Sequence, residues 1–169
     1  MGVEVHSMSK GFNMIGWRMA FVAGHARIVQ AFADVKDNSD SGQFGAIQNA
    51  AAFALEDPEI PVRTRTKYKR RLEKLVAALQ RCGFQCQMPG GTYFLYTRAP
   101  AGLADGTKFE TAEAASQYFI TQHSIVTVPW DDAGPFLRFS VTYEAADEAA
   151  EDALMAATED RLKQCKLVF

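Results

Sequence analysis

The feature that most constrains the fold is a regular apolar stripe in the middle of the chain. Between residues 61 and 82, apolar side chains recur at intervals of three and four, at Tyr68, Leu72, Leu75, Val76 and Leu79. This spacing places them on one face of a long α-helix that begins at Pro61 or Val62 and ends at Gly83. Such a helix buries its apolar face against another layer of structure.

The sequence after this helix alternates between strand-like and helical patterns. Strands are predicted at residues 84–88, 92–97, 125–128 and 136–143. Helices are predicted at residues 111–123, with Thr111 as a cap, and at residues 145–166. Residues 61–169 are therefore expected to form a small α+β domain in which helices pack on a sheet.

The first sixty residues have the pattern of a piece of a larger domain. A short strand at residues 3–7 and a glycine-rich link at 10–16 precede an apolar run at 17–23, which predicts a buried strand. Two helices follow, one opened by Gly24-His25 and one at residues 44–55. Two short strands and two helices are too few to close a core, so we expect residues 1–60 to be the remnant of a domain truncated at its start. The overall class is α/β.

Composition excludes several classes of function. The net charge is −2, which gives no general attraction to nucleic acid, and no apolar stretch is long enough to span a membrane. The start of the chain lacks the pattern of a signal peptide. Cys82, Cys86 and Cys165 form no metal-ligand pattern and suggest reduced thiols in the cytoplasm.

A cluster of basic residues in the long helix invites a nucleic-acid interpretation. Its members are Arg63, Arg65, Lys67, Lys69, Arg70, Arg71 and Lys74. Because Tyr68 and Leu72 interleave with them as the buried side, we expect these charges to form the solvated face of the helix. The acidic balance of the whole chain also argues against nucleic acid.

The segment from Ser7 to Ala20 contains the residues with the clearest chemistry. It has the form S-x-S-K-x(5)-G-x-R, with Ser7, Ser9, Lys10, Gly16 and Arg18 at the fixed positions. A neutral lysine amine attacks an aldehyde to form a Schiff base, and an arginine grips a phosphate through parallel hydrogen bonds to which serine hydroxyls add donors. The alternative is a solvated loop lysine flanked by turn residues.

This string resembles the cofactor-binding segment of fold-type-I pyridoxal-phosphate enzymes, specifically the class I/II aminotransferases of the LL-diaminopimelate and aspartate branches. The resemblance implies that Lys10 is the catalytic lysine that carries pyridoxal 5'-phosphate. It further implies that Ser7, Ser9 and Arg18 contact the phosphate. The fold it implies is the end of the large domain followed by the small C-terminal domain.

A second match lies at residues 136–142. Strand alternation puts Phe136, Arg138 and Ser140 on one face and the apolar Leu137 and Phe139 on the other. The resemblance implies that Arg138 binds the α-carboxylate of the substrate. The alternative is a buried salt bridge or a charge on an edge strand.

Two shorter matches agree with this register. Pro89-Gly90-Gly91 resembles the turn that enters the small domain's sheet, although a plain tight turn explains it equally well. Residues 40–44 resemble a segment near the subunit interface, but a loop that opens a helix accounts for Ser41 and Gln43, so neither receives a catalytic role.

The resemblance implies transfer of an amino group between an amino acid and a 2-oxo acid, by a parent protein that is a homodimer. It places the residues that stack on the cofactor ring and bond its nitrogen before this sequence, so the chain alone is expected to be weakly active or inactive. A lyase reaction on the same fold, or a truncated homologue that serves as an interaction module, remains an alternative. Neither a metal nor a nucleic-acid or membrane partner is expected.

Overall fold

The computed structural model describes all 169 residues and divides them into two compact units, Met1–Thr66 and Lys67–Phe169. The division lies inside the long helix α4 (Glu59–Arg81), whereas the sequence predicted a boundary near residue 60. Each unit has a separate cluster of buried apolar side chains. The assignment of the units to a large-domain remnant and a small domain stays a prediction.

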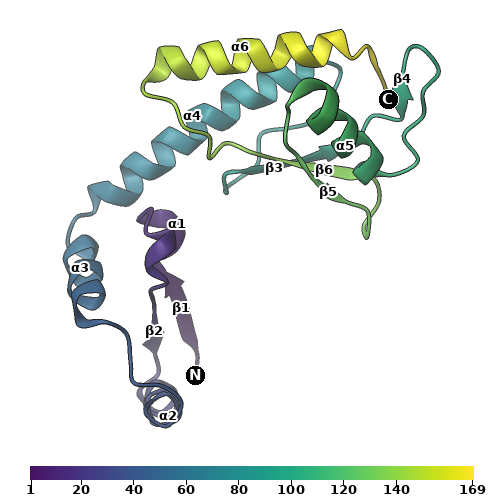
Figure 1. The fold of residues 1–169 in the computed structure, drawn as a ribbon. Helices are drawn as coiled ribbons and strands as arrows, with labels where there is room; N and C mark the ends of the chain where they lie inside the picture. The colour runs from purple at the N-terminus through teal and green to yellow at the C-terminus, as the bar shows by residue number, and fades with distance from the viewer. The chain divides into compact units, whose positions relative to one another are not determined.

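The first unit is built on a two-stranded antiparallel sheet (Figure 1). Strand β1 (Val3–Ser7) pairs with β2 (Ala20–Gly24), with Val3 opposite Gly24 and Ser7 opposite Ala20. Helix α1 (Met8–Gly11) and the 3-10 helix η1 (Ile15–Trp17) connect the strands at the end of the hairpin away from the N-terminus. Gly24 is needed where it is, because its φ is +145° and a Cβ there would lie 2.5 Å from the carbonyl oxygen of Gly2.

The prediction of a buried strand over residues 17–23 is wrong in extent and in burial. Ile15–Trp17 form a 3-10 turn and Arg18 has a left-handed φ of 53°, so the strand begins only at Ala20. Because β2 has β1 as its one neighbour, its side chains are exposed or half-buried. The predicted link over residues 10–16 includes the end of α1 and the start of η1.

Two helices follow the hairpin, as predicted, and the start of α4 also belongs to the first unit. Helix α2 (Ala26–Asp37) is capped by His25, whose ring Nδ1 accepts the backbone N–H of Arg27 at 3.3 Å, and α3 (Gly45–Leu55) follows. The buried cluster is small and consists of Met8, Ala51 and Ala54. Partly buried side chains pack around it: Phe12, Met14, Met19, Phe21 and Ile60.

The second unit packs helices on a three-stranded antiparallel sheet of order β3-β6-β5. The strands are β3 (Phe94–Arg98), β6 (Phe136–Ser140) and β5 (Val128–Trp130). Helices α5 (Ala112–His123) and α6 (Glu148–Gln164) cover the sheet together with the part of α4 in this unit, and α6 runs alongside α4 (Figure 1). A small sheet pairs β4 (Gly102–Leu103) with β7 (Leu167–Val168).

The core of the second unit confirms the helical stripe and the strand alternation. Leu72, Leu75 and Leu79 of α4 are buried, as are Leu137 and Phe139 of β6. The cap of α5 is also as predicted, since the Thr111 hydroxyl accepts the N–H of Ala114 at 3.1 Å.

Two predicted strands are wrong or displaced. Residues 84–88 are not a strand, because the Phe84 N–H donates to Leu79 and the carbonyl of Cys86 accepts the Gln80 amide at 2.8 Å, both in α4. Residues 125–127 lie before strand β5, which begins at Val128. The Ile125 N–H donates instead to the carbonyl of Phe119 in α5, at 3.0 Å. In both segments, alternating burial comes from packing beside a helix.

The expectation that all the basic residues of the long helix are solvated is wrong for Arg71. Its side chain is buried, with 2% of the residue exposed, and its Nε donates to Glu151 at 2.6 Å. The partner lies on α6, eighty residues later, so helical periodicity alone does not reveal it.

The structure contains no helix with the length and apolar character that spanning a bilayer requires. It also contains no group of three or more His, Cys, Asp or Glu side chains able to hold a metal ion.

Candidate functional site

The structure brings the four residues predicted to bind the cofactor to one end of the β1–β2 hairpin. They are Ser7, Ser9, Lys10 and Arg18. The Met8 N–H donates to the Met19 carbonyl at 3.0 Å, and the Met14 N–H donates to the Met8 carbonyl at 3.2 Å. Met8 is fully buried and anchors α1 in the core. The backbone that leads to Lys10 is therefore closed onto the backbone that follows Arg18.

Short local contacts shape the lysine side of this end. The Ser7 hydroxyl caps α1 by accepting the Ser9 N–H at 3.1 Å, which leaves the hydroxyl proton of Ser7 available to donate. Lys10 lies in the last turn of α1 and is exposed, while Ser9 is half-buried. The capped turn thus presents a hydroxyl and an amine at the strand end.

Arg18 supplies the cationic side. Its left-handed backbone turns the chain back into β2, and its guanidinium donates to the Ile15 carbonyl at 3.2 Å. No salt bridge in the structure includes Arg18. One contact occupies only part of the five-donor guanidinium, so it keeps N–H groups for a further anion.

These residues fit a ligand that carries both a phosphate and an aldehyde. A guanidinium and a hydroxyl are phosphate donors, and a primary amine is the group that condenses with an aldehyde. The segment from Ser7 to Ala20 has no Asp or Glu, so a bound phosphate would meet no carboxylate from this segment. The donor set fits pyridoxal 5'-phosphate at its phosphate and carbonyl.

Arg138 lies in the second unit, at the centre of β6. Its neighbours across the sheet are Tyr96 on β3 and Val128 on β5. Its guanidinium stacks on the ring of Phe94, with 4.3 Å between the guanidinium carbon and the ring centroid. The predicted alternative of a buried salt bridge is wrong, because Arg138 makes no ion pair. Stacking holds the guanidinium plane and leaves its edge for a carboxylate.

Aromatic side chains that were not predicted to belong to the site lie beside Arg138 on this face of the sheet. Phe94 is half-buried, and Tyr96 and Trp130 are exposed and meet edge to face at 5.9 Å. Their strands were predicted only in part, so the register that puts Tyr96 opposite Arg138 was not available from the sequence. The alternation of Phe94 and Tyr96 after Gly91 was the one signal that could have indicated this face.

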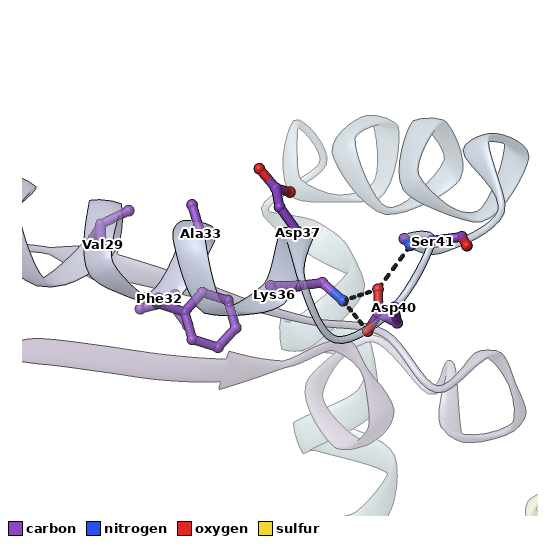
Figure 2. Close-up of a pocket in the computed structure, with 9 residues that line it drawn as sticks. Val29, Phe32, Ala33, Lys36, Asp37, Asp40 and Ser41 are labelled. Atoms are coloured by element: carbon purple, nitrogen blue, oxygen red, sulfur yellow. Dashed lines mark hydrogen bonds and ion pairs between the residues drawn. The ribbon is translucent and has the colours of Figure 1, made fainter.

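A pocket of the first unit contains none of the predicted site residues (Figure 2). It has a volume of about 500 Å³ and lies between α2 and the loop that follows it, lined in part by Val29, Phe32 and Ala33. At its polar end, Lys36 donates to Asp40 at 2.7 Å, and this hydrogen bond lowers the pKa of the Asp40 carboxyl. Lys36 and Asp40 of the pocket thus pair with each other, and Ser41 is one of the residues that line it.

Comparison with known proteins identifies the family. The family model for "Aminotransferase class I and II" matches residues 2–153, a range that includes Lys10, Arg18 and Arg138. The chain therefore belongs to the class I and II aminotransferases, a family whose members are generally dependent on pyridoxal phosphate.

The relatives refine this result. The chain is 50% identical over 174 residues to the LL-diaminopimelate aminotransferase of Methanococcus maripaludis, and 51% identical over 177 residues to that of Methanocaldococcus jannaschii. In both cases the alignment covers 100% of this chain and 42% of the relative. The chain thus spans less than half the length of these curated relatives.

Solved structures confirm the fold. Apo-BacF of Bacillus subtilis superposes with a TM-score of 0.80 at 30% identity, over 98% of this chain and 42% of BacF. The aspartate aminotransferase of Rhizobium meliloti gives a TM-score of 0.80 at 22% identity, over 98% of this chain and 42% of that chain, and shows likeness of fold alone. The α/β fold-type-I architecture predicted from the sequence is therefore confirmed for this portion.

Proposed function

We propose that this chain is the cofactor-anchoring and carboxylate-binding portion of an aminotransferase that moves an amino group between an amino acid and a 2-oxo acid. The observation that carries the proposal is the backbone closure between Met8 and Met19, which holds Lys10 and Arg18 at one strand end. Pyridoxal 5'-phosphate, when bound, supplies the electron sink that labilises the bonds at the substrate α-carbon.

Each residue has one role in this proposal. The Lys10 amine would hold the cofactor through its aldehyde, and the free amine would move the substrate α-proton as a general base. Arg18 and the hydroxyls of Ser7 and Ser9 hold the phosphate through charge-assisted hydrogen bonds. Arg138 orients the substrate through a two-pronged contact with its α-carboxylate.

For the substrate, we propose LL-diaminopimelate as the amino donor. The support is that two relatives about half identical to this chain are LL-diaminopimelate aminotransferases. We further propose that the complete protein is a cytoplasmic homodimer. The three free cysteines are consistent with a reducing compartment.

Complementation tests the activity. The chain would be expressed together with the portion of the Methanococcus maripaludis relative that it does not match, and glutamate formation from 2-oxoglutarate would be measured with LL-diaminopimelate, aspartate or alanine as donor. We expect activity with LL-diaminopimelate and its loss in Lys10→Ala. Lys69→Ala, an exposed lysine of α4, is the matched control and keeps activity.

Three results would contradict the proposal. Full activity in Lys10→Ala would exclude that lysine, and equal rates with all donors would remove the proposed substrate. Release of ammonia and pyruvate without an added 2-oxo acid would show a lyase.

A further inference from the structure

A buried arginine links the long helix to the strand that carries Arg138. The Arg71 Nε donates to Glu151 Oε1 at 2.6 Å, and its Nη1 donates to the carbonyls of Val141 at 3.2 Å and Tyr143 at 2.6 Å. The guanidinium carbon also lies 4.4 Å from the centroid of the Tyr143 ring. Both carbonyls belong to the segment that directly follows β6.

We propose that Arg71 is a positioning residue that fixes the carboxyl end of β6 and thereby the side chain of Arg138. The role of Arg138 in this statement rests on the proposed function, but the effect of Arg71 on its geometry does not. The sequence predicted that Arg71 is solvated and did not predict a contact between it and the end of β6.

Arg71 is connected to Arg138 by hydrogen bonds at the end of the β3–β6 pairing. The Val141 N–H donates to the Tyr93 carbonyl at 3.1 Å, next to the pairing of Phe94 with Ser140. Phe94 is the ring on which Arg138 stacks. Arg71 therefore holds two carbonyls at the place where the stacking partner of Arg138 is aligned.

Charge balance explains why an arginine fills this buried position. Glu151 is 2% exposed and accepts hydrogen bonds from Arg70 as well as Arg71, with 2.9 Å between Arg70 Nε and Oε2. The paired carboxylate offsets the cost of burying the Arg71 charge, and the remaining guanidinium donors bind the carbonyls of Val141 and Tyr143. A lysine keeps the charge but lacks the planar fork that reaches Glu151 and both carbonyls together.

The same two helices provide a matched control. Arg81 on α4 donates to Glu159 on α6 at 2.6 Å and 2.9 Å, so it also bridges the helices. It makes no hydrogen bond or ion pair with β6 or with the segment that follows it. Arg81→Lys therefore perturbs another arginine–glutamate pair between the same two helices, one whose arginine is 56% exposed, and leaves the end of the strand unchanged.

The test is an NMR measurement of the Arg138 side-chain Nε–H in the full chain, assigned with Arg138→Lys. Stacking on Phe94 is expected to displace this proton signal upfield. Arg71→Lys should remove most of that displacement, and Arg81→Lys should retain it. The double variant Arg71→Met with Glu151→Met replaces the buried pair by apolar side chains, which is expected to preserve folding while deleting the donors to Val141 and Tyr143. It should lose the displacement too.

Each outcome decides the proposal. An unchanged Arg138 signal in a folded Arg71 variant would overturn it, as would an equal loss in Arg81→Lys. Unfolding of both Arg71 variants would also overturn it, because Arg71 would then support the whole unit. Titration with 2-oxoglutarate separates the two proposals. If the Arg138 signal changes in the Arg71 variants but does not change when the dicarboxylate is added, carboxylate binding by Arg138 is contradicted, while its positioning by Arg71 still holds.

Discussion

The two units of this chain differ most in how much of their apolar surface is buried. The second unit has seventeen buried apolar side chains in one cluster, while the first has three. Apolar residues of the first unit such as Val5, Phe44 and Phe53 are exposed by more than 70%. The unit with Lys10 and Arg18 therefore has the smaller core, and the unit with Arg138 has the structure to be stable by itself.

The units also differ in their ion pairs. In the second unit, Glu151 joins α6 to α4 through three basic side chains, whereas the pair Lys36–Asp40 of the first unit lies within one turn. Long-range pairs fix helices relative to each other, while exposed local pairs contribute little. The chain therefore combines a scaffold braced by long-range ion pairs with a first unit that has the smaller buried core.

Removal of the central carboxylate should give the largest effect. Glu151→Ala leaves Arg71 buried without its counter-ion, which is expected to cost about 3–5 kcal/mol in the free energy of unfolding of the second unit. Urea unfolding followed by hydrogen exchange of α6 and β6 amides measures this. Asp152→Ala, which breaks only the pair between Lys74 and the exposed Asp152 carboxylate, is the control and should change stability by less than about 1 kcal/mol.

A pair of leucine truncations sharpens the contrast in core size. Leu137→Ala in β6 opens a cavity at a fully buried position and should cost about 2–5 kcal/mol, whereas Leu55→Ala, at 46% exposure in α3, should cost less than about 1 kcal/mol. Thermal and urea unfolding of both variants gives the comparison. Similar losses at the two positions would show that the first unit is as well packed as the second.

Acid should weaken the second unit through its paired carboxylates. Hydrogen bonds from Arg70 hold the pKa of Glu151 at about 2, and hydrogen bonds from Arg81 hold that of Glu159 at about 2, against 4.5 for an ordinary glutamate. Between these pKa values the unfolded chain binds more protons than the folded one. The stabilisation is therefore complete above about pH 4.5 and is lost as pH falls toward 2.

Unfolding free energies measured from pH 7 to pH 2.5 check this dependence. The decline with falling pH should be shallower in Glu151→Gln than in the unchanged chain. An identical slope would remove Glu151 from the explanation.

The sequence predicted those features that depend on local spacing. The stripe of α4, the Thr111 cap and the face of β6 that contains Arg138 follow from periods of 3.6 and 2 and from hydroxyl capping. The S-x-S-K-x(5)-G-x-R spacing also selected the residues that the hairpin later brings to one end.

Features that depend on distant partners were not predictable. Arg71 looks like any other charge of its helix until Glu151 lies beside it, and residues 84–88 alternate like a strand although they bond to α4. The stacking of Arg138 on Phe94 depends on the β3–β6 register, which a single sequence does not encode in its local pattern.

The central claim is that Lys10 and Arg18 act on one molecule of pyridoxal 5'-phosphate. Borohydride reduction of the full chain with limiting cofactor, followed by peptide mass spectrometry, tests it most directly. We expect the pyridoxyl group on Lys10, with the preference for pyridoxal 5'-phosphate over pyridoxal lost in Arg18→Ala. A label spread evenly over other exposed lysines such as Lys69, or a preference that survives loss of Arg18, would contradict the account.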